Sequence, residues 1–110
     1  MCYHTKVLKI IGSIIMNYNT NDGYKLLIKA LVAIENEEEC EAFLEDLMTK
    51  KELGDITQRL EVAKLLSEQT VYNKIVEKTG ASTATISRVN RAYLYGMGGY
   101  GKLLEKIKED

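Results

Sequence analysis

The segment from Thr70 to Leu94 constrains the fold more than any other part of this 110-residue chain. It contains no proline, and its only glycine is Gly80. One glycine between two stretches of helical periodicity is typical of two short helices joined by a tight turn. Glycine adopts the left-handed backbone conformation that other residues adopt only at a cost. Ser82 then stands where an N-cap is expected, with a hydroxyl able to accept from the backbone N–H of Ala84 or Thr85.

The spacing of the apolar residues predicts how these two helices pack together. Ala81 is small where the helices must cross closely, and Ile86 and Val89 form the expected buried stripe of the second helix. This is the layout of a helix-turn-helix over about 70–94, in which the second helix, about 82–92, lies in the DNA major groove. The side chains expected between the helices are Ile75, Val76, Thr79, Ala81, Ile86 and Val89.

Small hydroxyl, methyl and cationic side chains remain on the other faces. Hydroxyls can donate or accept at base edges, methyl groups can meet the methyl of thymine, and an arginine can grip a guanine or a phosphate. In this motif the first helix crosses the phosphates. We therefore expect base contacts from Thr83, Ala84, Thr85, Ser87 and Arg88. The expected phosphate contacts come from Thr70, Lys74, Lys78, Ser82 and Arg91.

The distribution of charge agrees with this prediction. From Gln69 to Leu103 there is a single acid, Glu77, against five cations, so this segment has a net charge of +4 while the whole chain has −1. A basic region that coincides with the motif favours DNA binding. Two amphipathic helices with a solvated basic face also occur in ordinary bundles, and the same shape can serve as a protein-interaction module. The five cations are Lys74, Lys78, Arg88, Arg91 and Lys102.

Nothing in the sequence indicates catalysis, because no clustered acids and bases, nucleophile–base pair or metal-ligand set is present. The single histidine, His4, and the two cysteines, Cys2 and Cys40, are too few for a zinc site or a disulfide framework. We therefore expect no enzyme, no cofactor, and a reduced cytoplasmic setting.

Gly96, Gly98 and Gly101 spell the dinucleotide fingerprint G-x-G-x-x-G. No strand is expected before this motif, and too few residues follow it for a βαβ unit. We therefore expect the glycines to end one helix and to form a hinge before the next. The tyrosines expected to pack nearby are Tyr93, Tyr95 and Tyr100.

The remaining residues predict an all-α protein. A helix is expected from Asp22 or Gly23 to about Ile34, and Asn36 caps a second helix that begins with three glutamates. Thr49 to Glu52 is a capping box for a third, which ends near Ser67. Thr70 is expected to cap the first motif helix. The apolar stripe of the third helix is predicted to be Leu53, Ile56, Leu60, Ala63 and Leu66.

Residues 21–110 are expected to form one helical domain, and residues 1–20 an N-terminal extension. The apolar stretch Val7 to Met16 is too short to span a bilayer. Two interpretations stay open: Met16 is the true start, or the stretch is a helix that docks on a partner.

Two stretches, QRLEVAKLL (residues 58–66) and TGASTATISRVNR (residues 79–91), resemble the tryptophan-repressor-like family, in its YerC/YecD branch. The resemblance extends more loosely from about residue 23 to residue 106. It implies an intertwined, all-helical homodimer with one helix-turn-helix per subunit, placed to meet successive major grooves of a palindromic operator. It also implies a transcriptional regulator, a repressor, that works at the bacterial nucleoid.

The resemblance does not imply that this chain binds the corepressor tryptophan. In the tryptophan repressor two arginines sandwich the indole ring, and a glycine after the second makes room for it. Arg88 matches the second arginine, but Val89 follows it, and its branched side chain would occupy the indole's space. The first arginine aligns near Gln58 or Arg59. We therefore expect a regulator that does not use tryptophan in this way, with its effector unassigned.

Overall fold

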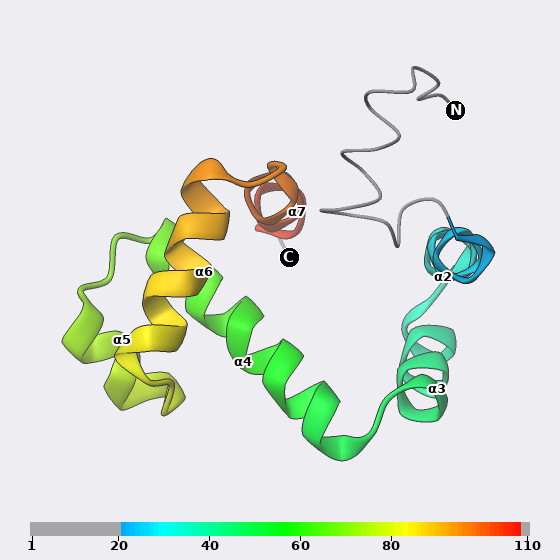
Figure 1. Ribbon diagram of the computed structural model, residues 1–110, viewed down its shortest axis with the longest axis horizontal. Coiled ribbons are helices and arrows are strands. Elements are labelled where there is room, and N and C mark those ends of the chain that lie inside the picture. Colours follow the sequence, from blue (N-terminus) through cyan, green and yellow to red (C-terminus); the bar gives the residue numbers. More distant parts are fainter. Residues whose placement is uncertain (1–20, 109–110) are drawn as a thin grey trace. The chain divides into compact units, whose positions relative to one another are not determined.

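The computed structural model describes residues 21–108, and the expectations for residues 1–20 lie outside this range. All six regular elements in this range are helices, which confirms the predicted all-α class (Figure 1). The chain divides into two compact units, one up to Phe43 and one from Leu44 onward. No helix in the described range is long and apolar enough to cross a membrane.

The first unit contains α2 (Asp22–Ala33) and the start of α3 (Glu37–Leu47). The side chain of Asn21 caps α2 by accepting from the backbone N–H of Tyr24 at 2.6 Å. As predicted, Asn36 caps α3 by accepting from the N–H of Glu39 at 2.8 Å. No residue of α2 is buried, and Val32 is 79% exposed. Within the described residues, α2 therefore gains little stability from packing.

The second unit is built on α4 (Lys50–Ser67), against which α5 (Tyr72–Thr79), α6 (Thr83–Tyr95) and α7 (Gly99–Ile107) all pack (Figure 1). The predicted capping box opens α4. Thr49 Oγ1 accepts from the N–H of Glu52 at 3.0 Å, and the Glu52 carboxylate accepts from the N–H of Thr49 at 2.9 Å. These two bonds satisfy backbone donors that the first helical turn leaves unpaired.

A small core joins α4 to the helix-turn-helix. The sequence correctly predicted that Ala63 contributes from α4, but it missed the fully buried Val62. Two other residues of the predicted stripe, Ile56 and Leu60, lie outside this core and are 37% and 44% exposed. The face that packs on α5 and α6 is centred on the small pair Val62–Ala63, which lets the helices approach closely. The buried residues are Val62, Ala63, Ile75, Ala81, Ile86 and Val89.

The glycine-rich segment separates α6 from α7 and belongs to no βαβ unit. Gly96 ends α6, and Gly98 precedes α7 with a φ of +85°. The predicted break is therefore present at Gly96 and Gly98, but it is shorter than predicted, because Gly101 already lies inside α7. Tyr100 is half-buried near the core, but Tyr95 is 81% exposed, so the prediction that it packs there was wrong. Tyr95 is the last residue of α6.

Candidate DNA-binding surface

The turn between α5 and α6 has the conformation that the sequence predicted. Gly80 has a φ of +72°, and its N–H donates to the carbonyl of Val76 at 2.8 Å. The Thr79 hydroxyl donates to the carbonyl of Ile75 at 2.8 Å and accepts from the N–H of Ala81 at 3.1 Å. These bonds close the end of α5 and fix the path of the chain into α6.

Ser82 caps α6, as predicted. Its Oγ accepts from the N–H of Thr85 at 3.1 Å and lies 3.1 Å from the Thr85 hydroxyl, to which it donates. Thr85 is half-buried, but its own hydroxyl hydrogen is not used in this bond. The cap therefore orients Thr85 while leaving it one donor for a base edge or a water molecule.

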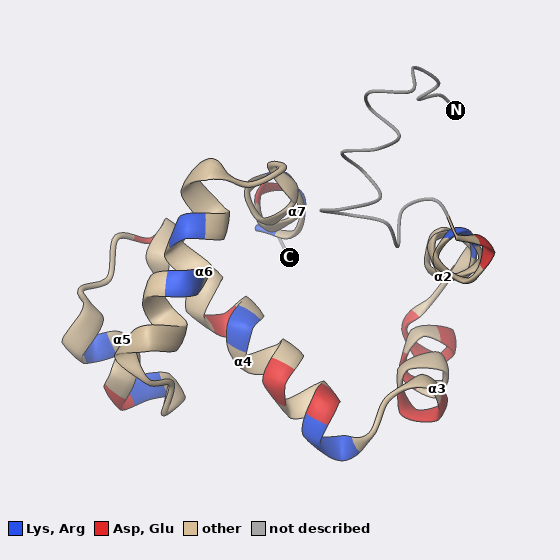
Figure 2. Ribbon diagram, viewed as in Figure 1, with Lys and Arg blue, Asp and Glu red and all other residues tan. Residues whose placement is uncertain are grey.

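The outer face of α6 is polar, exposed and free of acids. Ile86 and Val89 are buried on the inner face, while Arg88 and Arg91 are exposed on the outer one. Figure 2 shows that every charged position on α6 is basic. Within residues 21–108 neither arginine has an ion pair or a side-chain hydrogen bond. The other predicted base-reading residues exposed on α6 are Thr83, Ala84 and Ser87.

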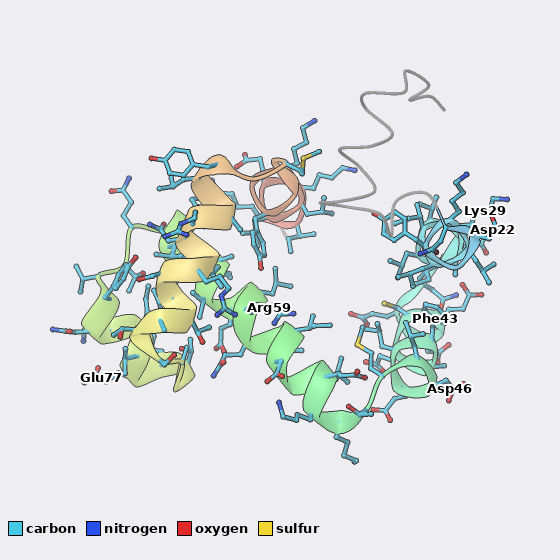
Figure 3. The ribbon with its side chains drawn as sticks, in the orientation of Figure 1. Asp22, Lys29, Phe43, Asp46, Arg59 and Glu77 are labelled. Carbon is cyan, nitrogen blue, oxygen red and sulfur yellow. The ribbon has the colours of Figure 1, made fainter. Side chains whose placement is uncertain are left out.

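The first motif helix differs in detail from the prediction. Lys74 and Lys78 are exposed on α5 and have no ion pair in the described part of the chain. The only acid of the helix, Glu77, lies at its outer edge, away from α4 (Figure 3). Val76, predicted to pack between the helices, is 37% exposed. That prediction was wrong because Ile75 is the buried residue of α5, and Val76 next to it faces away from the core.

Thr70 does not cap α5, which corrects a second prediction. Helix α5 begins at Tyr72, and its N-cap is Val71, whose side chain makes no capping bond. The N–H of Thr70 instead donates to the carbonyl of Leu65 at 3.0 Å, so it closes the end of α4. Thr70 is half-buried in the link between the helices.

One residue that holds the motif in place was missed by the sequence reasoning. Gln58 on α4 donates from Nε2 to the carbonyl of Thr79 at 3.1 Å, in a partly buried bond. Gln58 lies one helical turn before Val62 and so shares its inward face, which is the signal that could have revealed it. Its neighbour Arg59 is exposed (Figure 3).

The electrostatics around the motif are those of a solvated basic surface. In residues 21–108 no group of three His, Cys, Asp or Glu side chains is placed to hold a metal ion. At the end of α4, a hydrogen bond from Lys64 lowers the pKa of the exposed Glu68 carboxyl, and the positive charge of Lys78 contributes further. This carboxyl belongs to the end of α4 and not to α6.

Comparison with known proteins agrees with this geometry. The Trp repressor protein family matches residues 22–108, and the chain belongs to this family. It is 46% identical over 83 residues to the uncharacterised protein YerC of Bacillus subtilis (strain 168), covering 76% of this chain and 80% of YerC.

Two crystal structures share the fold. A TrpR-like protein from Eubacterium eligens ATCC 27750 superposes with a TM-score of 0.79 at 42% identity, covering 84% of this chain and 95% of that one. A proposed Trp repressor from Staphylococcus aureus gives a TM-score of 0.80 at 35% identity, covering 87% and 96%. Family membership thus supports a helix-turn-helix regulator as the class of protein.

Proposed function

We propose that this chain is a sequence-specific binder of double-stranded DNA that acts in the cytoplasm as a dimeric transcriptional repressor. The observation that carries the proposal is α6: one side is buried, and the other presents hydroxyls and two unpaired arginines without a single acid. A surface of this kind suits the major groove, where bases offer acceptors and the walls are phosphates.

The residues divide into two roles. Arg88 is proposed to read a guanine, and Thr83, Ala84, Thr85 and Ser87 to meet neighbouring base edges directly or through water. The groups proposed to hold phosphates are Thr70, Lys74, Lys78, Ser82 and Arg91. Of these, Ser82 already uses its hydroxyl as a cap. Its contribution to phosphate binding would therefore come largely from the backbone N–H groups at the start of α6.

A second copy of this chain is the proposed partner of the apolar surfaces left open. Helix α2 buries none of its residues, and in the other unit α4, α6 and α7 form an apolar groove. Family membership supports an intertwined homodimer in which such faces cover one another. Its two recognition helices would meet half-sites about 34–36 Å apart, one turn of DNA. Residues lining the groove include Leu60, Met97, Tyr100, Leu103 and Ile107.

We propose that tryptophan does not control this protein. Val89 is 2% exposed and belongs to the core between α4 and α6, and its branched side chain stands where the tryptophan repressor has the glycine that makes room for the indole. An indole ring at this position would have to displace it, and interiors packed at native density accommodate added volume poorly.

A protein-interaction role is the second candidate, and one observation favours it. Helix α5 and its N-cap expose apolar side chains, with Val71 at 64% and Val76 at 37% exposure. Apolar groups beside a basic surface also suit contact with another protein.

The salt dependence of binding separates the two candidates. If Lys74, Lys78 and Arg91 of both protomers each neutralise one phosphate, six phosphates are involved. The slope of log K against log salt concentration is then about −5. The measurement is fluorescence anisotropy of a labelled duplex between 50 and about 300 mM salt. A slope near zero, or no measurable binding at the lowest salt concentration, would favour the protein-interaction role.

A further inference from the structure

One side-chain hydrogen bond joins α4 to the turn of the motif. Gln58 donates from Nε2 to the carbonyl of Thr79 at 3.1 Å, across 21 positions of the sequence. Among residues 21–108, no other hydrogen bond joins α4 to α5, the turn or α6. Next to the link, the N–H of Thr70 also donates to the carbonyl of Leu65, and the apolar contacts of the small core hold the helices together.

The acceptor of this bond is a group that the helix itself cannot satisfy. Thr79 is the last residue of α5, and the last four carbonyls of a helix lack partners within it. The carbonyl of Val76 is taken by the N–H of Gly80, and the carbonyl of Thr79 by Gln58. Because the bond is partly buried, loss of the donor would leave a carbonyl with restricted access to water, which is unfavourable.

The position of Thr79 makes the bond important for the recognition helix. The Thr79 hydroxyl is itself bonded to Ile75 and Ala81, so both sides of the turn are tied to the residue that Gln58 holds. Apolar contacts have little directional preference, whereas a hydrogen bond constrains distance and angle. Gln58 thus constrains the turn from which α6 starts in a way that the apolar contacts do not.

We propose that Gln58 is a positioning residue that holds the helix-turn-helix on α4 in the orientation that reads DNA. In this arrangement no small molecule is needed to connect α4 to the turn. This inference rests on the proposed function, because it assigns a role in operator recognition. Gln58 touches no DNA in this role and acts through Thr79.

The test compares two variants on the same helix. Gln58→Met keeps the length of the side chain and removes the donor. The matched control, Thr57→Val, removes a side-chain hydrogen bond that stays within α4, from the Thr57 hydroxyl to the carbonyl of Gly54. Affinity is measured for the duplex that wild type selects from a random pool and for an unrelated duplex. Amide hydrogen exchange is measured for residues 79–86.

Gln58→Met is expected to lower the ratio of selected-duplex to unrelated-duplex affinity about threefold to tenfold, the range of one ordinary hydrogen bond. Exchange should rise at residues 79–86, and Thr57→Val should change neither quantity. Partial unfolding would lower both affinities together and leave their ratio unchanged. Gln58→Lys, which restores a donor of similar reach, should recover the exchange protection.

Two results would count against different parts of the account. An unchanged affinity ratio and unchanged exchange in Gln58→Met would overturn the positioning role while leaving DNA binding intact. If wild type selects no sequence but Gln58→Met still raises exchange at the turn, the structural link stands. In that case operator recognition is what fails.

Discussion

Two valines in the motif provide a direct test of the packing. Val89 on α6 is 2% exposed, and Val76 on α5 is 37% exposed. Each lies inside a helix, so replacement by alanine changes helix propensity equally in both, and the difference between the two variants reports burial.

Val→Ala removes two methyl groups, at about 0.8 kcal/mol for each buried carbon, and incomplete relaxation around the cavity adds to this. We expect Val89→Ala to lower the free energy of unfolding by about 2–2.5 kcal/mol and Val76→Ala by about 1 kcal/mol. The difference of about 1–1.5 kcal/mol is a large fraction of a typical total of about 5–15 kcal/mol.

The assay is urea unfolding followed by far-ultraviolet circular dichroism, at one fixed protomer concentration because dimerisation would link stability to concentration. With an ordinary slope of about 1.5 kcal/mol per M, the two midpoints should differ by about 0.7–1 M. Equal midpoints for the two variants would refute the burial of Val89. The argument against a tryptophan site beside Arg88 would then fall as well.

Four further outcomes are expected. Thr85→Ala should shift the sequence preference of binding. Lys78→Ala should weaken binding to all duplexes alike and reduce the salt slope by about 2 for a dimer. If both variants changed only the stability of the protein, their assignment to the DNA face would be contradicted. Gly80→Ala should cost about 1–2 kcal/mol in urea unfolding through the left-handed backbone alone, since no atom lies within 4 Å of the added Cβ. Thr49→Ala should cost about 1 kcal/mol by loss of the capping box, and a neutral result would show that α4 needs no cap. Tryptophan should leave the affinity for DNA unchanged. Calorimetry that shows micromolar binding of tryptophan to the protein, together with tighter binding of DNA in its presence, would contradict this.

Local signals in the sequence predicted much of the fold. Asn36, Thr49 and Ser82 all accept the capping bonds expected of them, because a cap depends on residues within one helical turn. Gly80 likewise has the left-handed conformation that its place between two helices predicted. The resemblance to the tryptophan-repressor-like family was confirmed by the family match over residues 22–108.

The errors arose where several helical faces compete for one core. The period of α4 was consistent with a stripe through Leu60, but contact with α5 and α6 selected the face of Val62 and Ala63. Val76 was assigned to the packed face for the same reason, because periodicity does not determine which of two adjacent apolar residues turns inward. Gln58 was missed because its partner is a backbone carbonyl, which a sequence does not display.

The measurement that tests the central claim most directly is selection of bound duplexes from a random DNA pool, at near-physiological salt and without any small molecule. The account predicts a palindrome whose half-sites lie about one helical turn apart, about 10 base pairs from centre to centre. Recovery of nothing but unselected DNA would contradict an effector-independent reader of sequence. It would leave the exposed face of α5 and α6 as a surface for another protein.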